Sequence, residues 1–421
     1  MSVTGPNTGF KIVNADGGPT TQDLGQRYVS KDYLLDLYPE LIPGRTTPGL
    51  WAWGRNFSSG LGDTVSGMLG DGTIVNKSSP VQIGTLTNWK QVSGGYDHSL
   101  AVKTDGTLWA WGTNNSLALR SPVIDEGALG DGTIVSKSSP VQIGALTNWK
   151  QVAGGQGFSA AVKTDGTLWT WGSNRQGQLG SGTVTRRSSP VQVGALTDWK
   201  QVSCGAYHMA AVRTNGTLYV WGYNTDGQLG DGTVVAKSSP IQVGLLTNWK
   251  QVAAGYDYTV AVKTDGTLWA WGNGDDGRLG DGTITSRSSP VQIGALTNWK
   301  QVACSKSVGS SSTGAVKADG TLWMWGNDTN GTLGQGVIAS RSSPIQVGLL
   351  TNWKQVSCGE IFTLALKTDG TLWSWGEAGA GQLGHNNTTD RSSPVQVGLL
   401  TNWKQVSAGS AHTLSILDGY I

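Results

Sequence analysis

Four histidines are the side chains of this chain that could most readily bind a metal or carry a proton. Three of them occupy a recurring Gly-x-x-His segment, and other copies of that segment hold phenylalanine or tyrosine. The histidines are His98, His208, His385 and His412, and the replacing residues are Phe158, Tyr258 and Phe362. Because phenylalanine cannot coordinate a metal, the exchange argues for packing or rim contacts and against a metal site.

The three cysteines could act as nucleophiles or form disulfides. Cys204, Cys304 and Cys358 each follow Gln-Val-Ser or Gln-Val-Ala, where the other copies of this segment hold glycine or alanine. A thiol that replaces such small residues within a strand predicts a buried free cysteine. We therefore expect no disulfide framework.

Two segments match the Gly-x-Gly-x-x-Gly pattern of dinucleotide-binding loops, at 272–277 and 379–384. Neither is expected to open a helix within a βαβ unit, which that use of the pattern requires. Asp275 and Asp276 could suggest calcium, but the distal glutamate of an EF-hand loop is absent, so a tight turn is the better interpretation. No Ser-His-Asp set and no carboxylate pair stands out. The sequence therefore predicts a non-enzymatic protein without catalytic residues, cofactor or metal.

The elements that position these residues come from an internal repeat. A Trp-Lys-Gln-Val segment recurs seven times, beginning at Trp89, Trp149, Trp199, Trp249, Trp299, Trp353 and Trp403. A fixed period near 50 residues is typical of propellers and solenoids, in which one repeat cannot bury its own apolar face.

Each repeat predicts four strands, named A to D. In the copy that begins at Trp149 they cover 149–153, 160–163, 167–172 and 189–194. The Asp-Gly pair between strands B and C favours a hairpin with a type I′ turn. A proline opens every strand D, which suits an outer edge strand because proline cannot donate a backbone hydrogen bond. The Trp-x-Trp pair of strand C is predicted to pack against the next blade.

The two ends of the repeat region are complementary. The chain enters at a strand C, with Leu50–Gly54, and leaves after strands A and B, with Trp403–Asp418. If these pieces share one sheet, seven complete blades close into a ring. The predicted fold is therefore all-β: a seven-bladed β-propeller of four-stranded antiparallel blades over 49–421, closed by a two-plus-two clasp of N- and C-terminal strands.

Three motifs carry a family resemblance: Gly-x-x-His-Ser/Thr, Asp-Gly-Thr-Leu-Trp-x-Trp-Gly and Gly-Gln-Leu-Gly. The first occurs at 95–99 and 409–413, and the last at 177–180, 227–230 and 381–384. With them the chain resembles the regulator-of-chromosome-condensation repeat family over residues 50–418. The resemblance implies a seven-bladed propeller. Family members include a guanine-nucleotide exchange factor, ubiquitin-ligase modules and a bacterial β-lactamase inhibitor, which share protein binding through one face. The close likeness of the copies resembles a bacterial or bacteriophage member.

The overall composition excludes some functions. Lys and Arg number 30 against 28 Asp and Glu, and charged residues make up 14% of the chain. No basic block favours nucleic acid or anionic lipid. Residues 1–18 lack the regions of a secretory signal, and no apolar run reaches the roughly 18 residues of a membrane helix. We therefore expect no nucleic-acid partner, no membrane insertion and a cytoplasmic location, unless the chain belongs to a particle.

Residues 1–48 share nothing with the repeat and predict an N-terminal arm. The arm is expected to be extended at first, with a short amphipathic helix from Ser30 to about Tyr38 that Pro39 and Pro43 end. Its apolar residues, too few for a core of their own, are Tyr28, Tyr33, Leu34, Leu35, Leu37, Tyr38, Leu41 and Ile42. We expect them to anchor the propeller on other protein subunits of an assembly; folding back onto the chain's own blades is the alternative.

Departures from the repeat predict a recognition face. The connections at 55–68, 113–128 and 305–313 are longer than in the other copies, and all join strand A to B or strand C to D. These connections lie on one face of an up-and-down sheet, and extra loop length on a rigid scaffold often carries function. The residues predicted to bind an unknown protein or surface ligand are Arg55, Phe57, Met68, Asn115, Leu119, Arg120, Asp125, Glu126 and Lys306, with the four histidines.

These observations leave three functional hypotheses. The leading one is a non-enzymatic protein-binding propeller that is a structural component of a phage particle, attached by its arm and located in the virion. The alternative is a regulator of a GTPase or an enzyme through the same loop face. A third, carbohydrate binding, would require exposed tryptophans.

Overall fold

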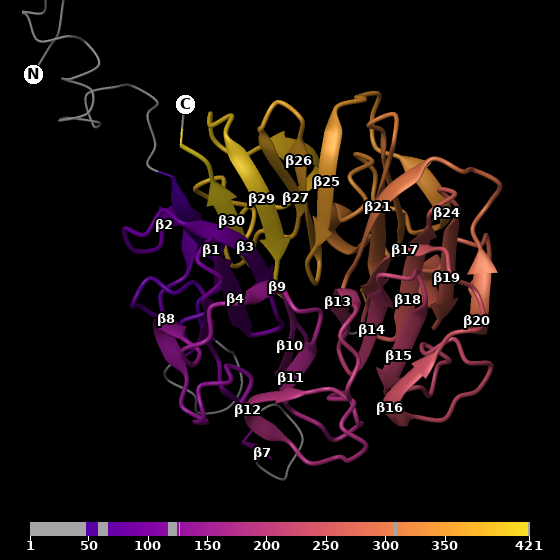
Figure 1. Cartoon of the computed structure of the whole chain (residues 1–421). Coiled ribbons are helices and arrows are strands. Elements are labelled where there is room, and N and C mark those ends of the chain that lie inside the picture. The colour runs from indigo at the N-terminus through magenta and orange to yellow at the C-terminus, as the bar shows by residue number, and fades with distance from the viewer. Residues whose placement is uncertain (1–47, 58–65, 117–123, 126, 307–309, 420–421) are drawn as a thin grey trace, which may run out of the picture. The chain divides into compact units, whose positions relative to one another are not determined.

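The computed structural model describes residues 48–57, 66–116, 124–125, 127–306 and 310–419. Over these residues it contains seven four-stranded antiparallel sheets, arranged as the blades of a propeller, and one two-stranded ribbon (Figure 1). The predicted fold class is confirmed. The predicted arm, with its helix and its anchor residues from Tyr28 to Ile42, lies outside the described residues.

Blades 1 to 3 follow one another along the chain. Blade 1 contains β3 (Trp89–Gly94), β4 (His98–Lys103), β5 (Leu108–Gly112) and β8 (Lys137–Gln142). Blade 2 contains β9 (Trp149–Gly154), β10 (Phe158–Lys163), β11 (Leu168–Gly172) and β12 (Arg187–Gln192). Blade 3 contains β13 (Trp199–Cys204), β14 (His208–Arg213), β15 (Leu218–Gly222) and β16 (Lys237–Gln242).

Blades 4 to 6 repeat this order. Blade 4 contains β17 (Trp249–Ala254), β18 (Tyr258–Lys263), β19 (Leu268–Gly272) and β20 (Arg287–Gln292). Blade 5 contains β21 (Trp299–Cys304), β22 (Ser312–Lys317), β23 (Leu322–Gly326) and β24 (Arg341–Gln346). Blade 6 contains β25 (Trp353–Cys358), β26 (Phe362–Lys367), β27 (Leu372–Gly376) and β28 (Arg391–Gln396). Short 3-10 turns, η2 (Asp275–Gly277) and η3 (Thr329–Gly331), lie in C–D connections.

Blade 7 joins the two ends of the propeller. It contains β29 (Trp403–Ala408), β30 (His412–Leu417), β1 (Gly49–Gly54) and β2 (Lys77–Gln82). Strand β1 pairs with β30 in an unbroken register from Gly49 opposite Leu417 to Gly54 opposite His412. The predicted clasp is therefore confirmed.

The hairpin between strands B and C forms with a different turn from the one predicted. In blade 1, Gly106 has a φ of 78°, but the preceding Asp105 does not have a positive φ, as a type I′ turn would require. The N–H of Gly106 donates to the carbonyl of Lys103, and Lys103 N–H donates to that of Thr107. This is a type I turn followed by a left-handed glycine. The Asp105 carboxylate stabilises it by accepting from the N–H and the hydroxyl of Thr107 (2.9 and 2.7 Å).

Tryptophans fill the space between consecutive blades, as predicted. Trp111 of blade 1 is fully buried against Leu50 and Leu69 of blade 7, and its Nε1 donates to the carbonyl of Met68 (2.9 Å). The strand-A ring of Trp89 lies 6.4 Å from the ring of Trp111. Burial of one such ring contributes roughly 2–3 kcal/mol. The second tryptophan of each pair is buried and the first is half-buried, so the tryptophans serve the core, which removes the basis for carbohydrate binding.

Glutamines on the innermost strands connect each blade to the next. Gln91 Nε2 donates to the carbonyl of Val152 (3.1 Å), and Gln91 Oε1 accepts from the N–H of Val152 (2.9 Å). The ring closes between Gln405 and Val92, at 3.2 and 3.1 Å. The same paired bonds extend from Gln151, Gln201, Gln251, Gln301 and Gln355. Seven glutamines thus form a continuous belt around the axis.

A second contact between innermost strands takes two chemical forms. Where the fifth residue of strand A is serine, it faces glycine or alanine in the next blade: Ser93 Oγ accepts from the N–H of Gly154 (3.2 Å). Where it is alanine, it faces cysteine, whose thiol donates to the alanine carbonyl, as Cys204 does to Ala153 (3.4 Å). The seven pairs are Ser93–Gly154, Ser203–Ala254, Ser357–Ala408, Ser407–Gly94, Ala153–Cys204, Ala253–Cys304 and Ala303–Cys358.

This pairing explains the cysteines. All three are free and buried, as predicted. Burial raises the pKa of Cys204 and Cys358 to about 12, and it raises the pKa of Cys304 as well. These thiols therefore stay protonated at neutral pH and act as packing groups that fill the space left by alanine.

Candidate protein-binding face

The propeller has two faces with different chemistry. We call the face that carries the A–B and C–D connections the loop face, and the one that carries the B–C and D–A connections the turn face. On the turn face, the bonds of the Asp105 turn recur at Asp165, Asp265, Asp319 and Asp369. On the loop face, the first residue after each A–B glycine or its equivalent differs from blade to blade: Tyr96, Gln156, Ala206, Tyr256, Lys306, Glu360 and Ser410.

Five of the seven C–D connections hold their variable tips on an asparagine or aspartate that we call the hub; blades 4 and 6 have glycine and alanine at this position. In blade 2, Asn174 Oδ1 accepts from the N–H of Leu179 (2.9 Å), while its Nδ2 donates to the carbonyls of Thr183 and Thr185 (both 2.9 Å). Asn114 makes the equivalent bond to Leu129 (2.9 Å) across the longer loop of blade 1. The hub lets the loop tip change in length and sequence without leaving buried backbone groups unpaired.

The residues predicted in the two long C–D loops fall into different environments. Phe57 is 43% exposed, and Arg55 is half-buried with its N–H donating to the carbonyl of Ala411 (2.8 Å). Met68 is buried, so its side chain offers no surface, and its carbonyl accepts from Ser99 Oγ of blade 1 (2.8 Å). Asn115 is half-buried and lies on β6 (Asn115–Ser116). This strand pairs with β7 (Ile124–Asp125), which contains Asp125. The remaining predicted residues, Leu119, Arg120 and Glu126, lie outside the described residues.

The three Gly-x-x-His histidines are buried between blades. His98 Nε2 lies 2.8 Å from Ser159 Oγ, His208 Nε2 lies 2.9 Å from Thr259 Oγ1, and His412 Nε2 lies 3.1 Å from Ser99 Oγ. Each partner belongs to the next blade. Burial lowers the pKa of all three histidines to about 3, so the rings are neutral at pH 7. They offer no exposed surface to a partner.

The glycine of the motif explains why the rings can be buried. A Cβ on Gly409 would lie 2.0 Å from Cε1 of His412, and one on Gly95 would lie 2.3 Å from Cε1 of His98. The ring therefore stacks on the backbone of its own loop, where only glycine leaves room. The same close approach holds for Phe158 over Gly155, so phenylalanine replaces histidine without loss of packing.

The fourth histidine has another role. His385 is half-buried within the C–D loop of blade 6, with Nε2 2.9 Å from Ser374 Oγ. Burial and then the charge of Arg391 lower its pKa. His385 thus contacts a strand of its own blade, and its ring is partly exposed.

Lys306 spans the axis. It begins in the A–B connection of blade 5, and its Nζ donates to the carbonyls of Gly154 (2.5 Å) and Gly94 (3.4 Å) in blades 2 and 1, on the opposite side of the ring. Burial lowers its pKa. A residue predicted to face a partner therefore directs its ammonium to backbone carbonyls of the propeller itself.

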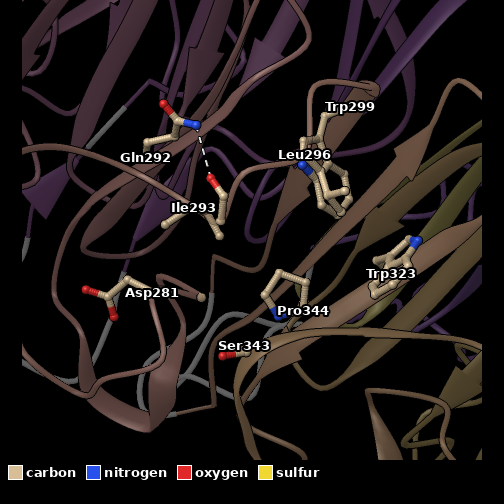
Figure 2. A pocket seen from close by; sticks show the side chains of 10 residues that line it. Asp281, Gln292, Ile293, Leu296, Trp299, Trp323, Ser343 and Pro344 are labelled. Carbon is tan, nitrogen blue, oxygen red and sulfur yellow. Dashed lines mark hydrogen bonds between the residues drawn. The ribbon is translucent and has the colours of Figure 1, made fainter.

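A pocket of about 270 Å³ lies between blades 4 and 5, near the turn face (Figure 2). Trp299, Trp323 and Pro344 form one side, Asp281 and Ile293 the other, and Gln292 Nε2 donates to the carbonyl of Gly294 (3.0 Å) at its rim. These residue types recur at the same places in other repeats. The pocket is thus a feature of the repeated packing and does not single out a ligand site.

No group of three or more His, Cys, Asp or Glu side chains in the described ranges is placed to hold a metal ion. Within those ranges, no helix is long and apolar enough to cross a bilayer.

The repeats of this chain also match a known protein family. The family model "Regulator of chromosome condensation (RCC1) repeat" matches residues 49–102, 125–162, 165–212, 215–262, 265–309, 319–366 and 369–416. Together these matches cover well over half of the chain. The chain belongs to the RCC1 repeat family.

Curated relatives match shorter pieces of this RCC1-repeat chain. Protein pim1 of Schizosaccharomyces pombe is 33% identical over 128 residues, which cover 30% of this chain and 24% of that protein. The mitochondrial RCC1 domain-containing protein RUG3 of Arabidopsis thaliana is 30% identical over 130 residues, 30% of this chain and 25% of that protein. The probable E3 ubiquitin-protein ligase HERC6 of Homo sapiens is 37% identical over 127 residues, 29% and 11% respectively. The matches thus span about a quarter or less of these relatives.

Solved RCC1-like structures match the whole propeller. Human WBSCR16 has a TM-score of 0.74 at 22% identity, covering 90% of this chain and 100% of that one. Prp20p of Saccharomyces cerevisiae, described with its binding properties to Gsp1p and histones, has a TM-score of 0.73 at 19% identity, covering 92% and 95%. At these identities the likeness establishes the shared fold.

These comparisons correct three predictions. The named relatives are eukaryotic, so the predicted bacteriophage or bacterial origin is not supported, and the predictions of a phage structural component and a virion location are wrong. The likeness of the copies, from which that origin was inferred, has a physical cause within the fold. Each copy must present the same glutamine, tryptophan and turn residues to its neighbours, so uniform copies report on packing and not on the source.

Proposed function

We propose that this chain is a non-catalytic regulator that binds a partner protein, a small GTPase or an enzyme, through its loop face. The observation that carries the proposal is the distribution of variation. The turn face repeats the same bonds in blade after blade, whereas the residues of the loop face vary among the blades. A variable surface on a symmetric body suits one asymmetric partner.

The relatives support the same class of function. Prp20p is described with binding to the proteins Gsp1p and histones, and in complex with the protein Kap60. Protein partners are therefore described for Prp20p, a structure that shares this fold. That the partner of this chain is a GTPase or an enzyme is part of the proposal. The predicted N-terminal arm lies outside the described residues, and the proposal does not depend on it.

Direct binding to purified small GTPases tests the proposal. The full chain is immobilised and exposed to a panel of small GTPases in GDP-bound, GTP-bound and nucleotide-free states, and nucleotide release is followed with a fluorescent GDP analogue. We expect one GTPase to bind, with a preference among the three states. A double variant of the loop face, Phe57→Ala with Glu360→Ala, should weaken that binding about tenfold or more.

The turn face supplies the matched control. Leu349→Ala changes an exposed residue there and should leave binding unchanged. If no GTPase binds, or if the two variants lose affinity equally, the proposal in its GTPase form is wrong.

A further inference from the structure

Three tyrosines meet on the loop face at the junction of blades 3 and 4. The rings of Tyr207 and Tyr223 lie 6.2 Å apart at 75°, and those of Tyr207 and Tyr256 lie 5.7 Å apart at 74°. The N–H of Tyr223 donates to the carbonyl of Tyr207 (2.9 Å), which fixes the two loops together. All three residues are half-buried, so part of each ring is open to solvent. Near-perpendicular rings of this kind form the corner of an aromatic cage.

The packing of the fold does not require these tyrosines. In blade 2 the three equivalent positions hold small residues, and the same scaffold forms there. The equivalent sets are Asp97, Thr113 and Gln156; Gly157, Ser173 and Ala206; Asp257, Asn273 and Lys306; Ser311, Asn327 and Glu360; Ile361, Glu377 and Ser410; and Ala411, Arg55 and Tyr96. These six sets contain one aromatic residue, whereas the set of blade 3 contains three.

Carboxylates adjoin the tyrosine cluster. Asp226 lies in the same loop as Tyr223, and Asp257 directly follows Tyr256. Asn273 connects the two loops, since its Nδ2 donates to Asp226 Oδ1 (3.3 Å) and its N–H donates to the backbone carbonyl of Asp257 (2.9 Å).

One arginine partly balances this charge. Arg278 Nη1 lies 2.8 Å from Asp257 Oδ1, and its Nη2 lies 3.5 Å from Asp276 Oδ2. Burial raises the pKa of Asp257 even so; Arg278 opposes that effect and Asp226 adds to it. The three carboxylates of this sector, on Asp226, Asp257 and Asp276, thus outnumber its one arginine, Arg278.

We propose that Tyr207, Tyr223 and Tyr256, with Asp226 and Asp257 beside them, form a receptor for an arginine or lysine side chain of a partner protein. A cation over a tyrosine face is attracted by the negative charge density of the ring, and a nearby carboxylate strengthens the attraction. The same carboxylates repel phosphate, which argues against a nucleic acid or an anionic lipid surface. This inference deepens the proposed function and rests on its loop face, but it requires no particular GTPase.

Labelled peptides provide a probe that needs no known partner. The full chain is titrated into a fluorescent Gly/Ser peptide that carries three spaced arginines, and anisotropy is read at low salt. The control peptide carries citrulline, which keeps the shape of arginine without its charge. We expect the arginine peptide to bind at least about fivefold more tightly than the citrulline peptide, and a lysine peptide to fall between them.

Variants separate the aromatic ring from general charge. Tyr223→Ala should weaken binding of the arginine peptide about 3- to 20-fold, while Tyr223→Phe, which keeps the ring, should stay within twofold of the natural protein. Glu377→Gln removes a negative charge elsewhere on the loop face and should also stay within twofold. Circular dichroism melts of each variant establish that the propeller remains folded.

Two results would overturn the receptor. One is equal affinity for the arginine and citrulline peptides. The other is a loss in Tyr223→Phe or Glu377→Gln as large as in Tyr223→Ala, because binding would then depend on the hydroxyl or on overall charge. The two proposals can fail separately. If the chain binds no GTPase but binds the arginine peptide in a tyrosine-dependent way, the proposed function is wrong and the receptor stands. If the chain binds a GTPase but its peptide binding does not depend on the tyrosines, the receptor is wrong and the proposed function stands.

Discussion

The two faces of the propeller grow from the same strands and yet obey different rules. On the turn face, each B–C hairpin places an aspartate or asparagine to accept from the same threonine, as Asn215 does with Thr217 at 2.7 Å. On the loop face, neighbouring blades present tyrosine, glutamate, lysine or alanine at one equivalent position. The strand ends on the turn face therefore maintain the body of the propeller, that is, its seven packed blades. The strand ends on the loop face are available for recognition.

The variable loops remain compatible with a uniform body because five of the seven share the same polar anchor. The hub residue Asn224 accepts from the N–H of Leu229 (2.9 Å), and Asp328 takes the same place in blade 5 by accepting from Leu333 (2.8 Å). Beyond the hub, substitutions touch few buried groups, so their effect on stability is small. Variation on the loop face therefore costs the fold little, which is the condition for a recognition surface.

The largest expected effect comes from breaking the body itself. Deletion of Trp403–Ile421 removes β29 and β30 and leaves β1 and β2 as a two-stranded sheet with open edges. Because a lone pair of strands is marginal in water, we expect loss of cooperative unfolding and aggregation. Differential scanning calorimetry of the truncated chain measures this. A transition at the temperature of the full chain would show that the body does not depend on the clasp.

The second effect tests whether the histidines at the base of the loop face serve the body. Burial lowers the pKa of His98, His208 and His412 to about 3 in the fold, against about 6.5 when unfolded. Between these values the unfolded chain binds more protons. Stability is thus complete above pH 6.5 and falls as the pH drops toward 3, by up to about 1.4 kcal/mol per histidine per pH unit.

A phenylalanine variant is the control, because Phe158 and Phe362 already fill this slot in two blades. Thermal midpoints from pH 7 to pH 5 should fall steeply for the natural chain and much less for the triple His→Phe variant. Equal slopes for the two proteins would mean that other groups cause the acid sensitivity and that the histidines do not stabilise the body.

The third effect concerns the glutamine belt. Gln201→Ala leaves the N–H and carbonyl of Val252 without their side-chain partner. We expect a loss of about 1–2 kcal/mol in the free energy of unfolding, measured by urea denaturation. Gln292→Ala removes an exposed glutamine of the outermost strand and should change it by less than about 0.5 kcal/mol. Equal losses in the free energy of unfolding would show that a glutamine of the belt stabilises the propeller no more than an exposed glutamine does.

Sequence reasoning recovered the body more completely than the site. The repeat, the prolines of strand D and the complementary ends suffice for seven blades and the clasp, because each copy meets the same neighbours. The turn type was wrong, since the aspartate side chain stabilises a type I turn in which glycine alone has a positive φ. The serine–glycine and alanine–cysteine pairs were missed, although the fifth residue of each strand A, compared with the sixth of the next copy, contains the signal.

The site was harder to predict because a side chain's burial depends on its neighbours in space. Lys306 lies in a variable loop, but its ammonium reaches carbonyls on the far side of the ring, which no local pattern reveals. The tyrosine cluster was also missed. Its three members are distant in sequence, and only a comparison of three equivalent positions across consecutive copies shows that they are unusual.

The smallest expected effect is on the turn face. Three exposed leucines there could bind a partner, which would contradict the assignment of recognition to the loop face alone. Leu245, Leu349 and Leu399 are 92%, 91% and 91% exposed. Other copies place alanine or threonine there, so the body does not need leucine. Each lies at a different blade boundary, and single exposed apolar residues are common on soluble proteins. The triple Leu→Ala variant should therefore unfold within about 0.5 kcal/mol of the natural chain and bind a loop-face partner equally well. Titration of that partner against both proteins decides the matter: a loss as large as that of Tyr223→Ala would place recognition on both faces.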